Sequence, residues 1–402
     1  MEPNSNNTAN QMKQIYLDYA AATPVDIRVL SAMQPYFTEK FYNPSASYLS
    51  AKHIREEYES KKAILANSIG AKSPDLIITA GATESINLAF TVLRNYQAAH
   101  CLILETEHAA VRESAKNLSS DYNEIKVDRS GLIDLEDFKS KIKDNTVLVS
   151  IALANNELGT IQPLSEVSRL LQEVREQRLK SKNLTPIYLH SDASQAMNLI
   201  DLSVARLGVD MLTINAAKIY GPKGIGALYV ARGIRLSPIT FGGGQEMGLR
   251  SGTENVPNLV GFSVASELAK KHLVSSRKQY QALAKTFREI IEQKSKITPL
   301  WLGNPKHQLA NFIPVCFNGL DAERLIFKLE DRGIYVSTGA ACAASKGQKS
   351  HVLSAIGLSD SEIAGSLRIT LGKDTTIEDI KTAADNLAEV VNLEARRLKL
   401  ID

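Results

Sequence analysis

Short apolar runs alternate with amphipathic stretches along the first 230 residues of the chain. The first unit has apolar residues at helical spacing over 47–69, followed by the apolar run DLIITA at 75–80. Gly81 follows this run, and a second amphipathic stretch begins at Glu84. Because helices that alternate with buried strands cover the faces of a parallel sheet, this pattern predicts an α/β fold.

The same alternation continues as far as residue 230. The run TVLVSIALA is apolar throughout, which is typical of a parallel strand that is buried on both faces. A turn-forming GPKG separates the last two strands of this region. We expect further strands at 101–105, 146–154, 187–190, 211–215 and 225–230, and helices from Ala109 and over about 164–177.

A change of pattern after Gly242–Gly244 indicates a second structural unit. A long helical stretch over 257–293, which we expect to be bent, leads away from the sheet and contains the predicted domain boundary. Beyond it we expect strands at 311–317, 334–337 and 366–370, and helices over 321–332 and from 377. We therefore predict an N-terminal segment (1–26, a tail plus part of the small domain), a large domain (27–265) and a small C-terminal α/β domain (266–402).

Composition and charge exclude several classes of protein. A chain of 402 residues exceeds the roughly 250–300 residues at which one hydrophobic core stops growing, which favours two domains. The formal charge of +3 is spread without a basic block, so we expect no nucleic-acid partner. No run reaches the ~18 apolar residues of a membrane span, and the polar first fourteen residues lack an export signal, so we expect no membrane association.

The three cysteines, Cys101, Cys316 and Cys342, are odd in number and unrelated in spacing. This argues against a disulfide framework and against a zinc site, and it fits a reducing cytoplasm. Cys101 and Cys316 lie within apolar strands, where we expect them to be packing residues.

Several polar residues follow predicted strands, at the edge where open α/β sheets bind ligands. In TAGATES, Ala82 and Thr83 lie at a strand–helix junction whose backbone N–H groups can hold a phosphate, although Thr83 could instead cap the helix. His108 follows the strand CLILE, and Asn156 follows the strand that ends in SIALA. Both placements suit a ligand site, and capping or packing remains the alternative for each.

Asp192 and Lys218 complete a set with one chemical meaning. Pyridoxal phosphate requires a lysine for a Schiff base, a carboxylate for the pyridine nitrogen, an aromatic ring to stack on and a phosphate site at a helix N-terminus. Lys218, Asp192, His108 and the Ala82–Thr83 junction supply these four groups. Taken alone, Asp192 could be an N-cap and Lys218 a surface residue.

These segments resemble a cysteine desulfurase of the class V aminotransferase family over nearly the full length of the chain. The resemblance extends from YLDYAAATPV at 16–25 to LRITLGKDTT at 367–376. Between them stand, in the order and spacing of the family, GATES, TEH, NNELG, DASQA, KIYGPKGIGALYV, RSGTENVP and STGAACAAS. The resemblance implies a pyridoxal phosphate-dependent transferase of fold type I, with a large cofactor-binding domain and a small domain that carries the catalytic cysteine.

The resemblance also implies a role for each matching residue. By this resemblance, Lys218 forms the Schiff base, His108 stacks on the ring and moves protons, Asp192 binds the pyridine nitrogen and Gln195 binds the phenolic oxygen. Ala82, Thr83 and Asn215 bind around the phosphate, and Thr253 reaches in from the partner of a homodimer. Asn156 and Arg368 bind the substrate carboxylate. Asn156 counts among the cofactor-binding residues as well.

Cys342 separates a desulfurase from its transaminase relatives. By resemblance, its thiolate takes sulfur from L-cysteine as a persulfide, leaves L-alanine, and passes the sulfur to an acceptor protein such as an iron–sulfur scaffold or a sulfur carrier. The alternatives are another fold-type-I activity, namely a selenocysteine lyase or an aminotransferase, or a catalytically weakened regulatory relative.

The chain departs from the family immediately before Lys218, where Ser-Gly-His is usual and Asn215, Ala216 and Ala217 stand instead. Tyr48 likewise replaces a frequent histidine. Because Ala217 cannot donate a side-chain hydrogen bond to the phosphate, we predict weaker cofactor retention than is usual. Titration of the apoprotein with pyridoxal phosphate should show tighter binding for Ala217→His, and an unchanged affinity would contradict the prediction.

Overall fold

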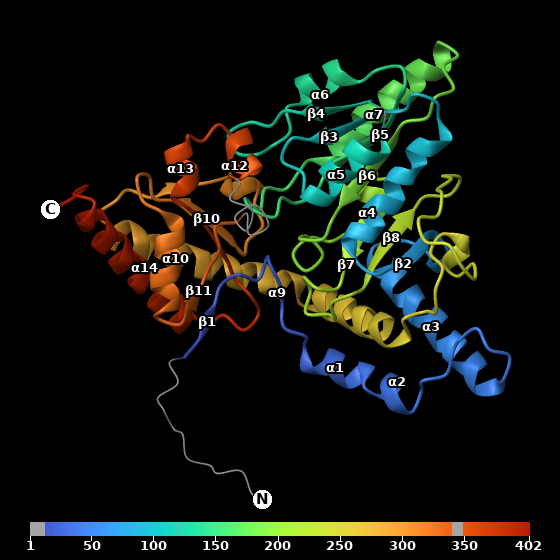
Figure 1. The fold of residues 1–402 in the computed structure, drawn as a ribbon, viewed down its shortest axis with the longest axis horizontal. Coiled ribbons are helices and arrows are strands. Elements are labelled where there is room, and N and C mark those ends of the chain that lie inside the picture. The colour runs from blue at the N-terminus through green and yellow to red at the C-terminus, as the bar shows by residue number, and fades with distance from the viewer. Residues whose placement is uncertain (1–12, 120, 340–348) are drawn as a thin grey trace, which may run out of the picture.

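The computed structural model describes residues 13–119, 121–339 and 349–402. They form a larger unit built on a seven-stranded sheet and a smaller unit built on a three-stranded sheet. Figure 1 shows the larger unit on the right, the smaller unit on the left, and helix α9 (Val256–Lys294) running from beneath the larger unit into the smaller one. The predicted α/β fold is thereby confirmed.

The larger sheet has the strand order β2-β8-β7-β6-β5-β3-β4. In that order the strands span Leu76–Thr79, Gly226–Val230, Met211–Asn215, Tyr188–Asp192, Thr146–Ser150, His100–Leu104 and Asp121–Ile125. Within this sheet β8 alone is antiparallel to its neighbours, and the other six strands run in one direction. The carboxyl ends of six strands therefore meet at one edge, where open α/β sheets bind ligands.

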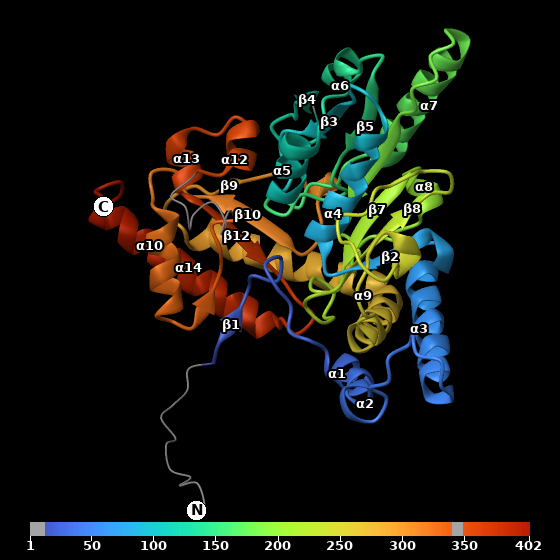
Figure 2. The same cartoon turned by 45° about the vertical axis from the view of Figure 1, so that its right-hand side comes forward.

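Helices cover both faces of this sheet, as the turned view in Figure 2 shows. On β3, Cys101 and Ile103 pack in the cluster of α4 and α5, whereas Leu102 and Leu104 pack in the cluster of α3 and α7. This alternation is the two-residue period of a strand buried on both faces. The helices of the larger unit are α1 (Ile27–Met33), α2 (Pro35–Thr38), α3 (Leu49–Ser68), α4 (Ala82–Phe90), α5 (Ala109–Leu118), α6 (Leu135–Lys141), α7 (Leu164–Lys180) and α8 (Val204–Leu207).

The smaller unit contains the antiparallel sheet β12-β10-β9 and the parallel pair β1-β11. Its strands are β1 (Ile15–Tyr16), β9 (Leu300–Trp301), β10 (Phe312–Cys316), β11 (Ile334–Tyr335) and β12 (Ser366–Thr370). Its helices are α10 (Ala322–Glu330), α12 (His351–Ala355), α13 (Asp360–Ala364) and α14 (Ile377–Arg397). Since β1 pairs with β11, the N-terminal segment starts in the smaller unit before it enters the larger one.

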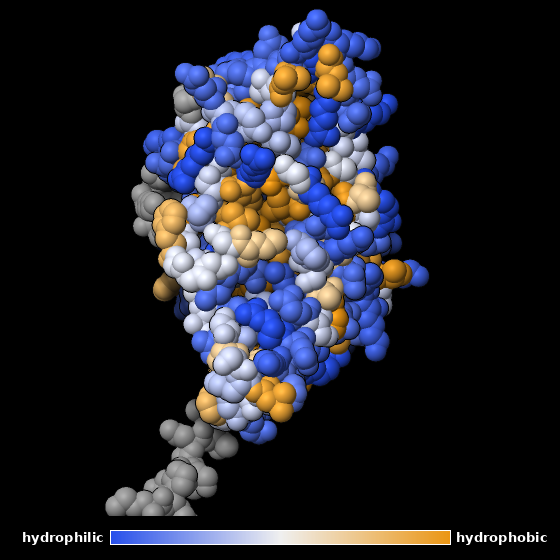
Figure 3. Space-filling model, turned by 90° about the vertical axis from the view of Figure 1, so that its right-hand side faces the viewer, coloured by the Kyte–Doolittle hydropathy of each residue, from blue (hydrophilic) through white to orange (hydrophobic). Residues whose placement is uncertain are grey.

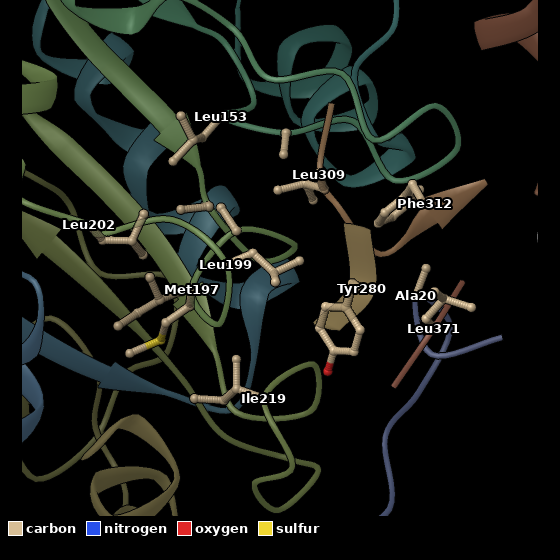
Figure 4. Packing of buried hydrophobic residues seen from close by; sticks show 14 of the residues in the cluster. Ala20, Leu153, Met197, Leu199, Leu202, Ile219, Tyr280, Leu309, Phe312 and Leu371 are labelled. Carbon is tan, nitrogen blue, oxygen red and sulfur yellow. The ribbon is translucent and has the colours of Figure 1, made fainter. Parts of the chain in front are cut away.

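Helix α9 joins the two units through two separate buried stretches. Buried side chains occupy its first part up to Ser266 and its last part from Tyr280, whereas 267–279 contains none that is fully buried. Figure 4 shows Tyr280 and Leu309 in the same hydrophobic cluster as Leu153 and Leu199 of the larger unit. The two sheets therefore share one continuous core, and a domain division near 266 stays a prediction.

The structure also contains elements that the hydrophobic pattern did not indicate. Strand β4 has the sequence DYNEI, in which only Ile125 is buried, because it lies at the edge of the sheet. The expected strand at 146–154 ends at Ser150. Beyond it, the Ala152 N–H donates to the side chain of Glu107 and not to the backbone of a neighbouring strand.

No helix among the described residues is both long and apolar enough to span a membrane.

A buried polar chain crosses three central strands. His190 on β6 shares hydrogen bonds with Ser150 on β5 (2.8 Å) and Thr213 on β7 (3.0 Å), and all three residues are fully buried. Burial lowers the pKa of His190 to about 3, because a charged imidazole would lose its hydration.

This burial makes stability depend on pH. The unfolded chain binds a proton at His190 near pH 6.5, whereas the folded protein binds it only near pH 3, so acid favours unfolding between these values. As pH falls through that interval, the free energy of unfolding of wild type should decrease. In His190→Gln this decrease should be smaller by up to about 1.4 kcal/mol per pH unit. Urea titrations at several pH values measure the slope, and the exposed His53→Gln serves as the control. Equal slopes in wild type and His190→Gln would contradict the expectation.

Candidate active site

The parallel sheet brings most of the predicted site residues to one edge. These eight residues lie at or after the carboxyl ends of five strands of the larger sheet. They are Ala82 and Thr83 after β2, Asn215 and Lys218 at the end of β7, Asp192 and Gln195 after β6, Asn156 after β5 and His108 after β3. Residues as far apart in sequence as 82 and 218 therefore lie at one edge of the sheet because their strands end there.

The first turn of α4 lies at the β2 end of this edge of the sheet. No side chain caps the helix, so Thr83 is not the N-cap that was the alternative prediction. A pocket of about 470 Å³ lies against this turn, lined by Ala80, Gly81, Ala82, Thr83, Glu84, Asn87 and Ile239. Gly226 on β8 allows the turn its position, because a Cβ there would lie 2.7 Å from the carbonyl carbon of Gly81. Uncapped N–H groups beside an open pocket suit a phosphate.

Segment 20–23 lies against the residues that follow β6 and β7. The Lys218 ammonium donates to the Ala21 carbonyl, and Gln195 donates to the Ala20 carbonyl at 3.0 Å. The Thr23 hydroxyl donates to the Ala217 carbonyl, also at 3.0 Å. This segment therefore fixes the loop that carries Lys218 from the side opposite the strand.

Asn215 has an unsatisfied polar atom in this region. Its side-chain Oδ1 is buried and accepts no hydrogen bond from any residue that the structure describes. A buried amide oxygen without a partner costs free energy, so a donor supplied by a ligand would relieve that cost. The orphan atom stands three residues before Lys218, which fits a bound polar group at the end of β7.

Asp192 and His108 both make local hydrogen bonds that orient them. Asp192 Oδ1 accepts from the Ser194 backbone N–H (2.9 Å) and hydroxyl (2.5 Å), in a turn and not at a helix start, since α8 begins only at Val204. His108 is the N-cap of α5, where Nδ1 accepts from the Ala110 N–H at 3.1 Å. The capping alternative for His108 is thus observed, and stacking on a ring stays a prediction.

Arg368 on β12 connects the smaller unit to this edge. Its guanidinium is buried and pairs with Asp18 at 2.6 Å. Its Nη1 group donates to the carbonyls of Asn156 (2.9 Å) and Gly339 (3.0 Å). Nε is buried without an acceptor in the described part of the chain, so one donor of the fork remains for a ligand.

Two predicted residues stand apart from this cluster. Thr253 is exposed in the loop that precedes α9, after the 3₁₀ turn Glu246–Gly248. Cys342 lies outside the described residues. Of the described residues on either side of it, Gly339 accepts a hydrogen bond from Arg368 on β12, and Ser350 donates one to Glu157 after β5.

Sequence reasoning missed four residues that organise the site: Asp18, Glu107, Glu157 and His351. Burial raises the pKa of the Glu157 carboxyl, whose Oε2 accepts from the Ser350 hydroxyl at 2.6 Å. His351 Nε2 lies 2.9 Å from the carbonyl oxygen of Glu107. The signal was their position inside or beside recognised segments, since Glu107 stands in TEH and Glu157 in NNELG.

A lysine, a carboxylate and an uncapped helix start at one edge of a mostly parallel sheet are groups that a pyridoxal phosphate-dependent enzyme of fold type I requires. Comparison with known proteins agrees. The family described as aminotransferase class V matches residues 15–382, and the chain belongs to this family.

Relatives within the family match nearly the whole chain. "Cysteine desulfurase IscS 1" of Archaeoglobus fulgidus is 40% identical over 391 residues, which cover 96% of this chain and 97% of the relative. Among solved structures, a "NifS-like protein" superposes with a TM-score of 0.86 at 31% identity and covers 95% of this chain and all of its own. "SspA in complex with cysteine" gives 0.76 at 34% identity over 89% and 99%.

The described residues fit the cofactor of this family, pyridoxal phosphate. The pocket at α4 matches an anionic group, and the Asp192 carboxylate matches a ring nitrogen that must stay protonated.

The ion pair of Asp18 with the buried guanidinium of Arg368 yields a test of how much stability depends on this buried charge. Removing one partner of a buried pair leaves an uncompensated charge, so Asp18→Ala should lower the free energy of unfolding by about 3 kcal/mol. The matched control is Asp201→Ala, because Asp201 pairs with Arg206 where both side chains are exposed and should cost under about 1 kcal/mol. Urea unfolding measures both. Similar small losses in the two variants would contradict the buried-charge argument.

Proposed function

We propose that this protein is a cysteine desulfurase that converts L-cysteine into L-alanine and keeps the sulfur as a persulfide on Cys342. The observation that carries the proposal is the 40% identity to a cysteine desulfurase over 96% of the chain, together with Cys342 in the matching segment. In the overall step the carbon–sulfur bond of the substrate breaks and a sulfur–sulfur bond to Cys342 forms. The thiol proton ends on the carbon that lost sulfur, so atoms and electrons balance.

Pyridoxal phosphate, when bound, supplies an electron sink that stabilises negative charge on substrate carbon. Lys218 would hold it covalently, with the first turn of α4 at its phosphate and Asp192 at its ring nitrogen. Gln195 would bind its phenolic oxygen, and His108 would stack on its ring. The hydrogen bond from the Ala110 N–H to Nδ1 keeps that nitrogen unprotonated, so Nε2 is the atom through which His108 would give and take protons.

Substrate binding would use Asn156 and Arg368. The guanidinium of Arg368 is planar and carries donors on fixed directions, which suits a carboxylate. Three of its contacts already go to Asp18 and two backbone carbonyls, so the substrate carboxylate would use the Nε side of the group. The two carbonyls would hold the guanidinium in one orientation, and the guanidinium would in turn orient the bound amino acid.

We propose a homodimer in which Thr253 reaches the cofactor of the partner subunit. Thr253 is exposed, and its loop carries Phe241 and Met247 with 82% and 58% of their surface exposed. Figure 3 shows that hydrophobic side chains gather on this side of the molecule. Large exposed apolar patches mark interaction sites, and a second copy would cover this one.

The persulfide would be passed on to an acceptor, either an iron–sulfur scaffold protein or a sulfur carrier. Free thiols are consistent with a cytoplasmic enzyme, since the described cysteines, Cys101 and Cys316, form no disulfide. Burial raises the pKa of the Cys101 thiol to about 12, so this thiol does not compete as a nucleophile.

Alanine formation from L-cysteine, measured with cofactor-loaded protein and a thiol reductant, tests the function. We expect wild type to form alanine and Cys342→Ala to lose at least about a hundredfold of that rate, because the sulfur has no other acceptor thiol at the site. Cys101→Ala is the matched control and should keep the rate within about twofold, since this buried thiol takes no part. Alanine formation that survives Cys342→Ala would point to a selenocysteine lyase, and keto-acid formation to an aminotransferase.

A further inference from the structure

Glu107 has an unusual environment for an acid, between β3 and α5 and next to His108. Its residue is fully buried. One carboxyl oxygen, Oε1, accepts from the Ala152 N–H at 2.6 Å, whereas Oε2 is buried and meets no partner within the described ranges. We propose that Glu107 is a positioning residue whose side chain works as a neutral carboxylic acid and fixes the turn that carries His108 to the segment that follows β5. This proposal rests on the function proposed above and deepens it.

The surroundings favour the neutral form. An ionised carboxylate with a single hydrogen bond would be poorly compensated at this depth. Burial is the main cause that raises the pKa of Glu107 to about 8, and the charge of Asp192 on β6 acts in the same direction. Arg112 on α5 acts against it but is engaged elsewhere, because it donates to the Glu105 carbonyl and pairs with Glu124.

Glu107 also contacts the smaller unit through its backbone. Its carbonyl oxygen lies 2.9 Å from Nε2 of His351, the first residue of α12. Burial lowers the pKa of His351, and Nε2 donates this hydrogen bond because a carbonyl oxygen can only accept. The residue before it, Ser350, donates to Glu157 at 2.6 Å. The start of α12 is therefore held at two points by turns of the larger unit.

The side chain of Glu107 has two tasks, one that depends on its hydrogen bond and one that depends on its neutral state. The bond from Ala152 sets the height of the β3–α5 turn relative to the end of β5, and with it the place of His108. The neutral state also avoids placing a second negative charge near the carboxylate of Asp192, which the proposed function assigns to the ring nitrogen. A carboxylate at 107 would therefore harm the site even with the backbone in place.

Two substitutions separate the neutral acid from a carboxylate. Glu107→Gln keeps an oxygen for the Ala152 N–H and stays uncharged at every pH, whereas Glu107→Ala leaves that N–H unpaired. Glu105→Gln is the matched control, because Glu105 lies in the same turn after β3 and its side chain also accepts one backbone N–H, from Val127 at 2.8 Å.

The first measurement is unfolding of the apoprotein across pH, which needs no activity. The unfolded chain loses the Glu107 proton near pH 4.5 and the folded protein keeps it to about pH 8, so wild type should lose stability relative to Glu107→Gln as pH rises between these values. Glu105→Gln should track wild type. Parallel curves for wild type and Glu107→Gln would overturn the neutral-acid proposal, whatever reaction the enzyme catalyses.

The second measurement is the absorption band of the bound cofactor, recorded with kcat and KM at pH 7. We expect Glu107→Gln to keep the wild-type band and kcat within about threefold. Glu107→Ala should lower kcat at least tenfold and shift the pH dependence of the band, which a purely structural loss of folded protein would not do. An equal kcat loss in both variants would show that the carboxylate is required and would overturn the proposal. Inactive wild type with the expected stability curves would refute only the proposed function.

Discussion

The position of the active site depends on one buried charge, the guanidinium of Arg368. It lies on a strand of the smaller unit, yet its partners are Asp18 of the N-terminal segment and the backbone of Asn156 and Gly339. A guanidinium in this environment is tolerable only while these acceptors stay in place, because burying a charge without partners costs several kcal/mol. The electrostatic requirement of one side chain thus fixes the relative position of three segments that are distant in sequence.

The N-terminal segment extends this constraint to the cofactor side. Asp18 is held by Arg368, and the carbonyls of Ala20 and Ala21 accept from Gln195 and Lys218. The lysine proposed to hold the cofactor and the arginine proposed to bind substrate are therefore oriented by neighbouring residues of one short segment. This segment begins as a strand of the smaller unit, so the site forms only when both units are folded against each other.

Most of the fold was predictable from the hydrophobic pattern, because strands buried on both faces appear as continuous apolar runs. Strand β4 was not, since it lies at the sheet edge and is polar. Residues after strands, such as Asp192 and Lys218, were identifiable because parallel topology collects strand ends at one edge. The roles of Asp18 and Glu107 were not, because their partners lie 350 and 45 residues away and no local pattern encodes such pairings.

The two acids at the site differ in how many hydrogen bonds their side chains accept. Asp192 accepts two hydrogen bonds from Ser194, whereas Glu107 has a single donor for two buried oxygens. An enzyme that needs a negative charge at the ring nitrogen gains by keeping the next acid neutral, since two adjacent carboxylates would compete for one proton. The family motif that places an acid immediately before His108 is thus compatible with the chemistry only because the fold buries that acid. The burial of Glu107 is therefore what keeps its carboxyl group protonated.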